Sequence, residues 1–186
     1  ANLIRSKQRL QMALEDRVAV ITGASGGLGQ VVTRQFAEQG ARLALLGRST
    51  GRPETLVRQL GLSEDRYLLS AVDLSDPKGA RAAAAEVIEK FGRADILLHL
   101  VGGYAGGKSV VEAEAEELSG MLRQHVWTTF HLLQAFVPHL VANRWGRVVA
   151  VSHQDALNPP GNNSTYVVAK AGQEILLLSL AQELRG

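Results

Sequence analysis

The stretch Val18–Gly29 constrains the possible fold of this chain more than any other, because it predicts a strand, a glycine loop and the start of a helix in immediate succession. Residues 18–21 form an apolar run rich in β-branched side chains, which is typical of a strand buried on both faces of a parallel sheet. Glycines follow at positions 23, 26, 27 and 29. A helix N-terminus behind such a loop offers free backbone N–H groups and a positive dipole end, which bind pyrophosphate. The stretch therefore predicts a nucleotide site.

The spacing of these glycines leaves an alternative open. It is Thr-Gly, three residues, Gly, one residue, Gly, and it differs from the G-x-G-x-x-G spacing of the commonest dinucleotide loop. A tight turn between a strand and a helix, without any ligand, also fits the loop alone. The residues after it, Leu28, Val31, Val32 and Phe36, recur at helical spacing. We expect this apolar face to pack on the sheet.

Strand and helix patterns alternate along the rest of the chain. Further strands are predicted at residues 42–46, 67–72, 95–101 and 147–152, and helices at 76–91, 114–140 and 164–184. Asp76 as N-cap and Gly92 after the last turn delimit the first of these helices, and Pro138 should bend or end the second. The alternation predicts right-handed β-α-β units, and hence an α/β fold with a doubly wound parallel sheet.

Composition narrows the possible partners. The chain has 186 residues, 46% hydrophobic and 20% charged, and no cysteine, so disulfides and thiolate metal sites are excluded. No apolar run is long enough for a membrane span, and a net charge of +2 gives no reason to expect nucleic acid. We expect a small-molecule ligand, no metal and a cytoplasmic location.

Two regions are predicted, an N-terminal extension at residues 1–16 and one domain at 17–186. The extension carries three basic residues before its first acidic one. We interpret it as a helical extension that packs on the domain. A targeting peptide is the alternative, but the extension has no apolar core segment and little serine.

The residues that end each predicted strand are candidates for ligand contact, because ligands of such sheets lie along the carboxyl ends of the strands. Gly47 offers no carboxylate for the ribose hydroxyls of NAD, whereas Arg48 suits a 2′-phosphate. NADPH is therefore expected in preference to NADH, the alternative being that Arg48 is only a solvated surface residue. Asp73 and Leu74 could meet an adenine amine, and Val101-Gly102 would let backbone approach the cofactor.

Tyr166 and Lys170 form the second informative pattern. Residues four apart share a helix face, so the ammonium can lie beside the phenol. A cation there would lower the pKa of the tyrosine and make it a usable proton donor and acceptor. A surface pair without function is the alternative for this common spacing.

Together, Thr22–Gly29, Asp73, Tyr166 and Lys170 resemble the short-chain dehydrogenase/reductase family, in order and spacing as well as identity, and the resemblance runs from Arg17 to Gly186. It implies a Rossmann fold, a nicotinamide cofactor and hydride transfer between a carbonyl and an alcohol. Tyr166 would protonate the carbonyl oxygen, and Lys170 would bind the nicotinamide ribose. The expected cofactor-binding residues are Gly23, Ser25, Gly27, Leu28, Gly29, Arg48, Asp73, Leu74, Val101, Gly102, Tyr166 and Lys170.

Three positions depart from the family pattern. His99-Leu100-Val101-Gly102 stands where the family usually has Asn-Asn-Ala-Gly. The family's catalytic serine falls on His153, one residue after Ser152, and its helix asparagine falls on His125. We take His153 and His125 as catalytic candidates beside Tyr166 and Lys170. The alternative is that each histidine is merely hydrogen-bonded in a core or an interface.

The family also has a sixth strand, a substrate-covering segment and a seventh strand beyond the tyrosine helix, so we expect further residues after Gly186. The alternative is that the protein is short. The leading hypothesis is an NADP-dependent ketone or oxoacyl reductase. The alternative is a nucleotide-binding sensor or structural subunit that has lost catalysis. Because the 114–140 and 164–184 helices are apolar around more of their circumference than packing on one sheet face requires, a homodimer or homotetramer is expected.

Overall fold

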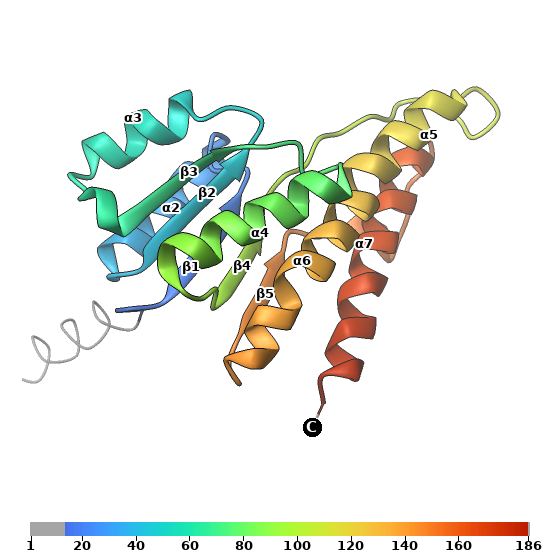
Figure 1. The fold of residues 1–186 in the computed structure, drawn as a ribbon. Helices are drawn as coiled ribbons and strands as arrows, with labels where there is room; N and C mark the ends of the chain where they lie inside the picture. The colour runs from blue at the N-terminus through green and yellow to red at the C-terminus, as the bar shows by residue number, and fades with distance from the viewer. Residues whose placement is uncertain (1–13, 186) are drawn as a thin grey trace, which may run out of the picture.

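Five parallel strands form the sheet of the computed structural model, which describes residues 14–185 (Figure 1). They are β1 (Val18–Thr22), β2 (Arg42–Gly47), β3 (Tyr67–Ala71), β4 (Ile96–His99) and β5 (Arg147–Ala150), in the spatial order β3-β2-β1-β4-β5. The chain starts at the centre, moves outward to β3, and then crosses over to β4. This is the predicted doubly wound, Rossmann-type sheet, and each predicted strand is confirmed to within two residues at its ends.

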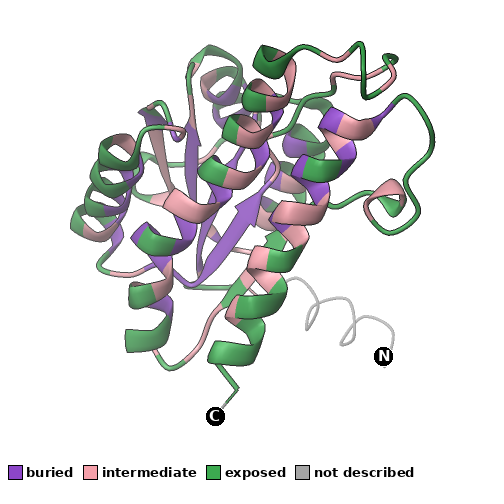
Figure 2. Ribbon diagram, turned by 90° about the vertical axis from the view of Figure 1, so that its right-hand side faces the viewer, coloured by how far each residue is buried: buried purple, intermediate pink, exposed green. Residues whose placement is uncertain are grey.

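Helices cover both faces of the sheet. Successive side chains of β1 point to opposite faces, so this strand contributes to the hydrophobic core on each side. On one face Ala19 and Ile21 pack with residues of α2 (Gly27–Glu38) and α3 (Gly51–Gln59). On the other face Val18 and Val20 pack with α4 (Pro77–Phe91) and α6 (Thr128–Ala142), and α7 (Ser164–Glu183) adds partly buried leucines. Figure 2 shows the buried strands enclosed by helices whose outer faces are exposed.

The sequence signals predict α4 well and α2 only in part. The Asp76 carboxylate accepts the Lys78 N–H at 2.9 Å, and Gly92 ends α4 in the left-handed conformation, as expected. The predicted apolar face of α2 is confirmed only in part, because Leu28 and Val31 are exposed. The buried face is built from Gly29, Thr33 and Ala37, with Val32 and Phe36 partly buried beside them. Helix α3 was not among the predicted elements.

The predicted 114–140 helix is one run with a π-helical turn inside it. Helix α5 (Ala115–Leu122) continues into η2 (Arg123–Trp127) and then into α6. In η2 the backbone hydrogen bonds join residues five apart, as in a π-helix. Pro138 lies inside α6 and does not end it. The predicted extension falls mainly outside the described residues, since only 14–16 of it belong to them.

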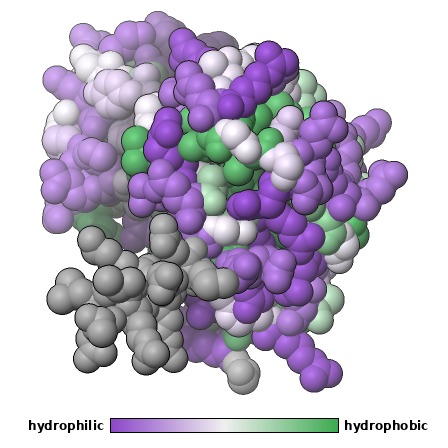
Figure 3. Space-filling view, turned by 90° about the vertical axis from the view of Figure 1, so that its left-hand side faces the viewer, coloured by the Kyte–Doolittle hydropathy of each residue, from purple (hydrophilic) through white to green (hydrophobic). Residues whose placement is uncertain are grey.

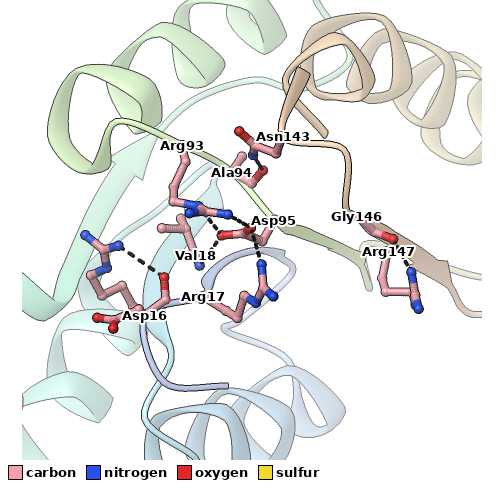
Figure 4. Close-up of polar contacts among 10 residues, drawn as sticks. Asp16, Arg17, Val18, Arg93, Ala94, Asp95, Asn143, Gly146 and Arg147 are labelled. Carbon is pink, nitrogen blue, oxygen red and sulfur yellow. Dashed lines mark hydrogen bonds and ion pairs between the residues drawn. The ribbon is translucent and has the colours of Figure 1, made fainter. Parts of the chain in front are cut away.

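A buried ion cluster joins the amino ends of the two central strands (Figure 4). The fully buried Asp95 carboxylate accepts hydrogen bonds from Arg17 (3.1 Å), the Val18 N–H (3.0 Å) and Arg93 Nε (2.9 Å). Burial alone would raise the pKa of Asp95, but these donors outweigh it and hold the pKa below its usual range. The Arg17 guanidinium also lies 3.9 Å from the centroid of the Trp145 ring. The cluster therefore fixes β1 against β4 at the edge opposite the glycine loop.

The surface on the α2 and α3 side is mostly hydrophilic, with one hydrophobic patch near its centre (Figure 3). Among residues 14–185, no helix is long and apolar enough to cross a membrane.

Candidate active site

The glycine loop after β1 leaves an open helix N-terminus. Gly23 has a φ of +77°, and a β-carbon there would lie 2.9 Å from the Leu100 carbonyl carbon and the Val101 nitrogen of the loop after β4. A β-carbon at Gly29 would overlap the Gly23 carbonyl oxygen, so both positions require glycine. Around Gly27, by contrast, the space is open. The N-cap Gly26 supplies no side-chain cap and the first turn of α2 has no acidic residue, so its N–H groups are available to an anion.

Two strand ends add charged groups beside this loop. Asp73, after β3, accepts hydrogen bonds from the Ser75 N–H (2.9 Å) and Ser75 hydroxyl (2.7 Å), which lower the pKa of Asp73. Arg48, exposed after β2, lowers that pKa further through its charge. The Arg52 guanidinium donates to the Ser25 carbonyl at 3.5 Å. Arg52 therefore contacts the glycine loop, and Arg48 and Asp73 lie near one another after the neighbouring strands.

Tyr166, near the start of α7, is the centre of a cluster of rings. The Tyr104, His125 and His153 rings lie edge-on to it, with centroid distances of 5.1, 5.8 and 5.7 Å. These rings come from the loop after β4, from η2 and from the loop after β5. Both expected catalytic histidines thus lie next to the tyrosine.

The expected effect of Lys170 on Tyr166 is wrong in this structure. The pKa of Tyr166 is raised, first by burial and then by the negative charge of Asp155 and the neighbouring Tyr104. The Lys170 ammonium instead donates to the Val151 carbonyl (2.7 Å) and to the Gln173 side-chain oxygen (3.0 Å). Burial also lowers the pKa of Lys170. The helical spacing brings the two residues to one face, but the Val151 carbonyl and the Gln173 side chain hold the ammonium away from the phenol.

His153 is held by the backbone that follows it. Its Nδ1 accepts the Asp155 N–H at 3.2 Å, and the Asp155 carboxylate lies 3.4 Å from the same nitrogen. Because Nδ1 accepts, the neutral ring carries its proton on Nε2. Ser152, the neighbouring hydroxyl, donates to Glu174 on α7 at 2.7 Å. His153 rather than Ser152 therefore presents a donor beside Tyr166.

His125 lies buried in the π-helical turn. Its Nε2 donates to the Gly103 carbonyl at 3.0 Å, so in the neutral ring Nδ1 is an acceptor, and that atom has no partner in the described residues. Burial, followed by the Lys170 charge, lowers the pKa of His125. The ring is therefore neutral at pH 7 and ties η2 to the loop after β4.

His99 ends β4 and is buried like His125. Its Nδ1 shares a 2.8 Å hydrogen bond with the Thr22 hydroxyl at the end of β1. Burial, followed by the charges of Lys170 and His125, lowers the pKa of His99 to about 3. His99 thus joins the two central strands at the edge that carries the glycine loop.

Several residues at this edge escaped the sequence analysis. Arg52, Tyr104, Asp155 and Gln173 all touch a predicted site residue. Only Arg52 had a usable signal in the sequence, since it is a second arginine four residues after Arg48. Among residues 14–185, no group of three or more histidine, aspartate and glutamate side chains could hold a metal ion.

Comparisons with known proteins agree with this geometry. Residues 17–186 match the sequence profile of the family described as short chain dehydrogenase. An uncharacterized oxidoreductase of Staphylococcus epidermidis is 28% identical over 171 residues, which are 92% of this chain and 73% of the relative. The crystal structure of L-sorbose reductase from Gluconobacter frateurii, complexed with NADPH and L-sorbose, has a TM-score of 0.84 at 30% identity, covering 94% of this chain and 66% of that one. A metagenomic short-chain oxidoreductase in complex with NADP has a TM-score of 0.82 at 29% identity, covering 92% and 78%.

The low pKa of His99 makes stability depend on pH. Between the unfolded pKa of about 6.5 and the folded value of about 3, only the unfolded chain binds this proton, so stability falls as pH falls. We predict that His99→Asn flattens the dependence of the unfolding free energy on pH between 6 and 4 by about 1.4 kcal/mol per pH unit. Urea titrations at several pH values measure it.

Thr22→Val is the matched control, because it removes the hydrogen bond and keeps the ring. It should retain the parental slope. Equal slopes in His99→Asn and the parent would show that this ring does not carry the effect.

Proposed function

Because the chain belongs to the short-chain dehydrogenase family, we propose that it is an NADP-dependent oxidoreductase that interconverts a carbonyl and an alcohol. The observation that carries the proposal is the meeting of two features at one sheet edge. The open N-terminus of α2 lies at the ends of β1 and β4, and the Tyr166 ring packs against residues that follow β4 and β5. A nucleotide site and a proton donor are what such a reaction requires.

The residues at the glycine loop fit a dinucleotide. The close contacts at Gly23 and Gly29 and the uncapped first turn of α2 form an anion cradle. Arg48 and Arg52 would bind a 2′-phosphate, and Asp73 would accept from the adenine amine. Loop residues Ser25, Gly27 and Leu28 would hold the pyrophosphate, while Leu74, Val101, Gly102 and Lys170 would contact the rest. When bound, the nicotinamide donates or accepts the hydride.

Tyr166 is the group that we assign to proton transfer. The phenol is protonated at neutral pH, so the side chain can protonate a carbonyl oxygen, which is the reductive direction. His153 would donate its Nε2–H to the same oxygen and so take the part of a hydroxyl donor. The Asp155 N–H supports this role, because it sets the tautomer of His153.

A nucleotide-binding protein without turnover is the second candidate. The observation that favours it is the position of the Lys170 ammonium, which binds Val151 and Gln173 rather than lowering the pKa of Tyr166. The two candidates differ in one test. If the parent reduces no member of a ketone and aldehyde panel while the double variant His153→Ser, His125→Asn does, the second candidate is favoured.

The first prediction concerns cofactor choice. NADPH should bind more tightly than NADH, and Arg48→Ala should reduce the difference by roughly ten- to a hundredfold, the effect of one charge-assisted contact. Fluorescence titration of both nucleotides measures it. Arg34→Ala is the control. It removes an equal charge from α2, about 10 Å along the helix from its N-terminus, and should change neither affinity. Equal affinities of the parent for NADPH and NADH would contradict the preference.

The second prediction concerns the proton donor. Tyr166→Phe deletes only the phenolic oxygen, so turnover of NADPH with a carbonyl substrate should fall by roughly 10²-fold or more while NADPH still binds. Steady-state rates and nucleotide titration separate the two effects. Tyr67→Phe is the control, because Tyr67 lies at the amino end of β3, away from the proposed site. Its turnover and NADPH affinity should equal those of the parent. Parental turnover in Tyr166→Phe would exclude the proposed chemistry.

The third prediction concerns assembly into a homodimer or homotetramer. Val168, Ile175 and Leu178 on α7 and Trp127 on η2 are each about half exposed or more, an apolar surface that a second subunit would cover. Light scattering at micromolar concentration should give at least twice the chain mass, and Ile175→Glu should lower it. Gln59→Glu on α3 is the control. A parental monomer would refute this assembly.

A further inference from the structure

The side-chain amide of Gln173 links α7 to the first turn of α6, directly after the π-helical turn that carries His125. Its oxygen accepts from the Lys170 ammonium at 3.0 Å, and its Nε2 donates to the Thr129 hydroxyl at 3.0 Å. That hydroxyl donates in turn to the His125 carbonyl at 2.6 Å. A continuous path of hydrogen bonds therefore runs from the ammonium on α7 to the backbone of the π-helical turn.

The side chain of Gln173 lies in a buried, tightly packed setting. Gln173 is 2% exposed, and Thr129 is equally buried. One residue before Gln173, a β-carbon at Gly172 would lie 3.0 Å from the Val126 side chain, so α7 and η2 approach closely there. A buried amide is costly unless both its ends are bonded, and here both ends are. An apolar side chain of similar size would fill the same space without that cost, which indicates a role beyond packing.

We propose that Gln173 is a positioning residue, which holds the Lys170 ammonium with one end of its amide and the turn that carries His125 with the other. The proposal rests on the proposed function, in which Lys170 and His125 serve the reaction at Tyr166. Gln173 itself is too deeply buried to touch a substrate. It acts by fixing α7 and η2 relative to one another.

The surroundings of the ammonium make this anchor necessary. Lys170 is buried, its charge lowers the pKa of both His99 and His125, and its other acceptor is the Val151 carbonyl. Without Gln173, one neutral acceptor would remain for a buried cation. The ammonium would then be less stable and free to turn about that single contact.

Three variants of the full chain separate the two ends of the bridge. Gln173→Leu removes both contacts. Gln173→Glu keeps an acceptor for Lys170 but cannot donate to Thr129, and Thr129→Val keeps the Lys170 contact while cutting the link to η2. Gln182→Leu, exposed on the same helix, is the matched control.

The direct readout is the Lys170 titration in protein carrying ¹³C-labelled lysine, followed by NMR. The chain has five lysines. The signal that is missing from the spectrum of Lys170→Arg is the signal of Lys170. Loss of an acceptor disfavours the cation, so Gln173→Leu should lower the pKa of Lys170, and Gln173→Glu should raise it. Thr129→Val and Gln182→Leu should leave it unchanged.

Turnover supplies the second readout. Gln173→Leu should lower kcat roughly ten- to a hundredfold, the effect of one hydrogen bond to a charged group, with little change in the KM of the carbonyl. Thr129→Val and Gln173→Glu should also lower kcat, because each frees η2.

An unchanged Lys170 titration in Gln173→Leu would overturn the proposal, whatever happens to turnover. If Gln173→Leu does not fold, Gln173→Glu and Thr129→Val decide, and parental kcat in both would overturn it. A parent that reduces no carbonyl would refute the proposed function, whereas the Lys170 titration would still test the anchor by itself.

Discussion

The close approach of two backbone loops is the constraint on which the site depends. Gly23 lies so near the Leu100–Val101 peptide that no side chain fits between them, and Gly29 lies equally near Gly23. These contacts bring the start of α2 beside the end of β4. The Thr22–His99 hydrogen bond holds the same two strand ends from within the sheet. The open helix N-terminus and the ring cluster therefore share one sheet edge because glycine permits the backbone to come this close.

Burial, more than charge pairing, sets the electrostatics of the ring cluster. It is the largest cause of the lowered pKa at His99, His125 and Lys170, and of the raised pKa at Tyr166. All four shifts favour the neutral form of the side chain. The His99 and His125 imidazoles are therefore uncharged hydrogen-bonding groups at neutral pH, and Tyr166 keeps its proton.

Much of the fold follows from local sequence signals, and much of the site does not. Apolar runs and the Asp76 and Gly92 caps act within a few residues, so they predict the strands and α4 correctly. The core face of α2 depends on how close its helix lies to the sheet, which small residues such as Gly29 decide and hydropathy does not. The pKa of Tyr166 and the bridge through Gln173 depend on partners from distant segments. No periodicity records such contacts, although the Tyr166 to Lys170 spacing did locate the right helix face.

The π-helical turn at Arg123–Trp127 ties the length of one helix to the chemistry of the site. Such a turn holds one residue more than an α-helical turn, which rotates the flanking faces by about 100° relative to an unbroken helix. α5 and α6 are thus in register with their neighbours only while the extra residue is present. Loss of any residue here would restore a regular helix and carry the His125 imidazole away from Gly103. Insertions and deletions, which surface loops generally tolerate, would therefore displace the histidine if they occurred in this segment.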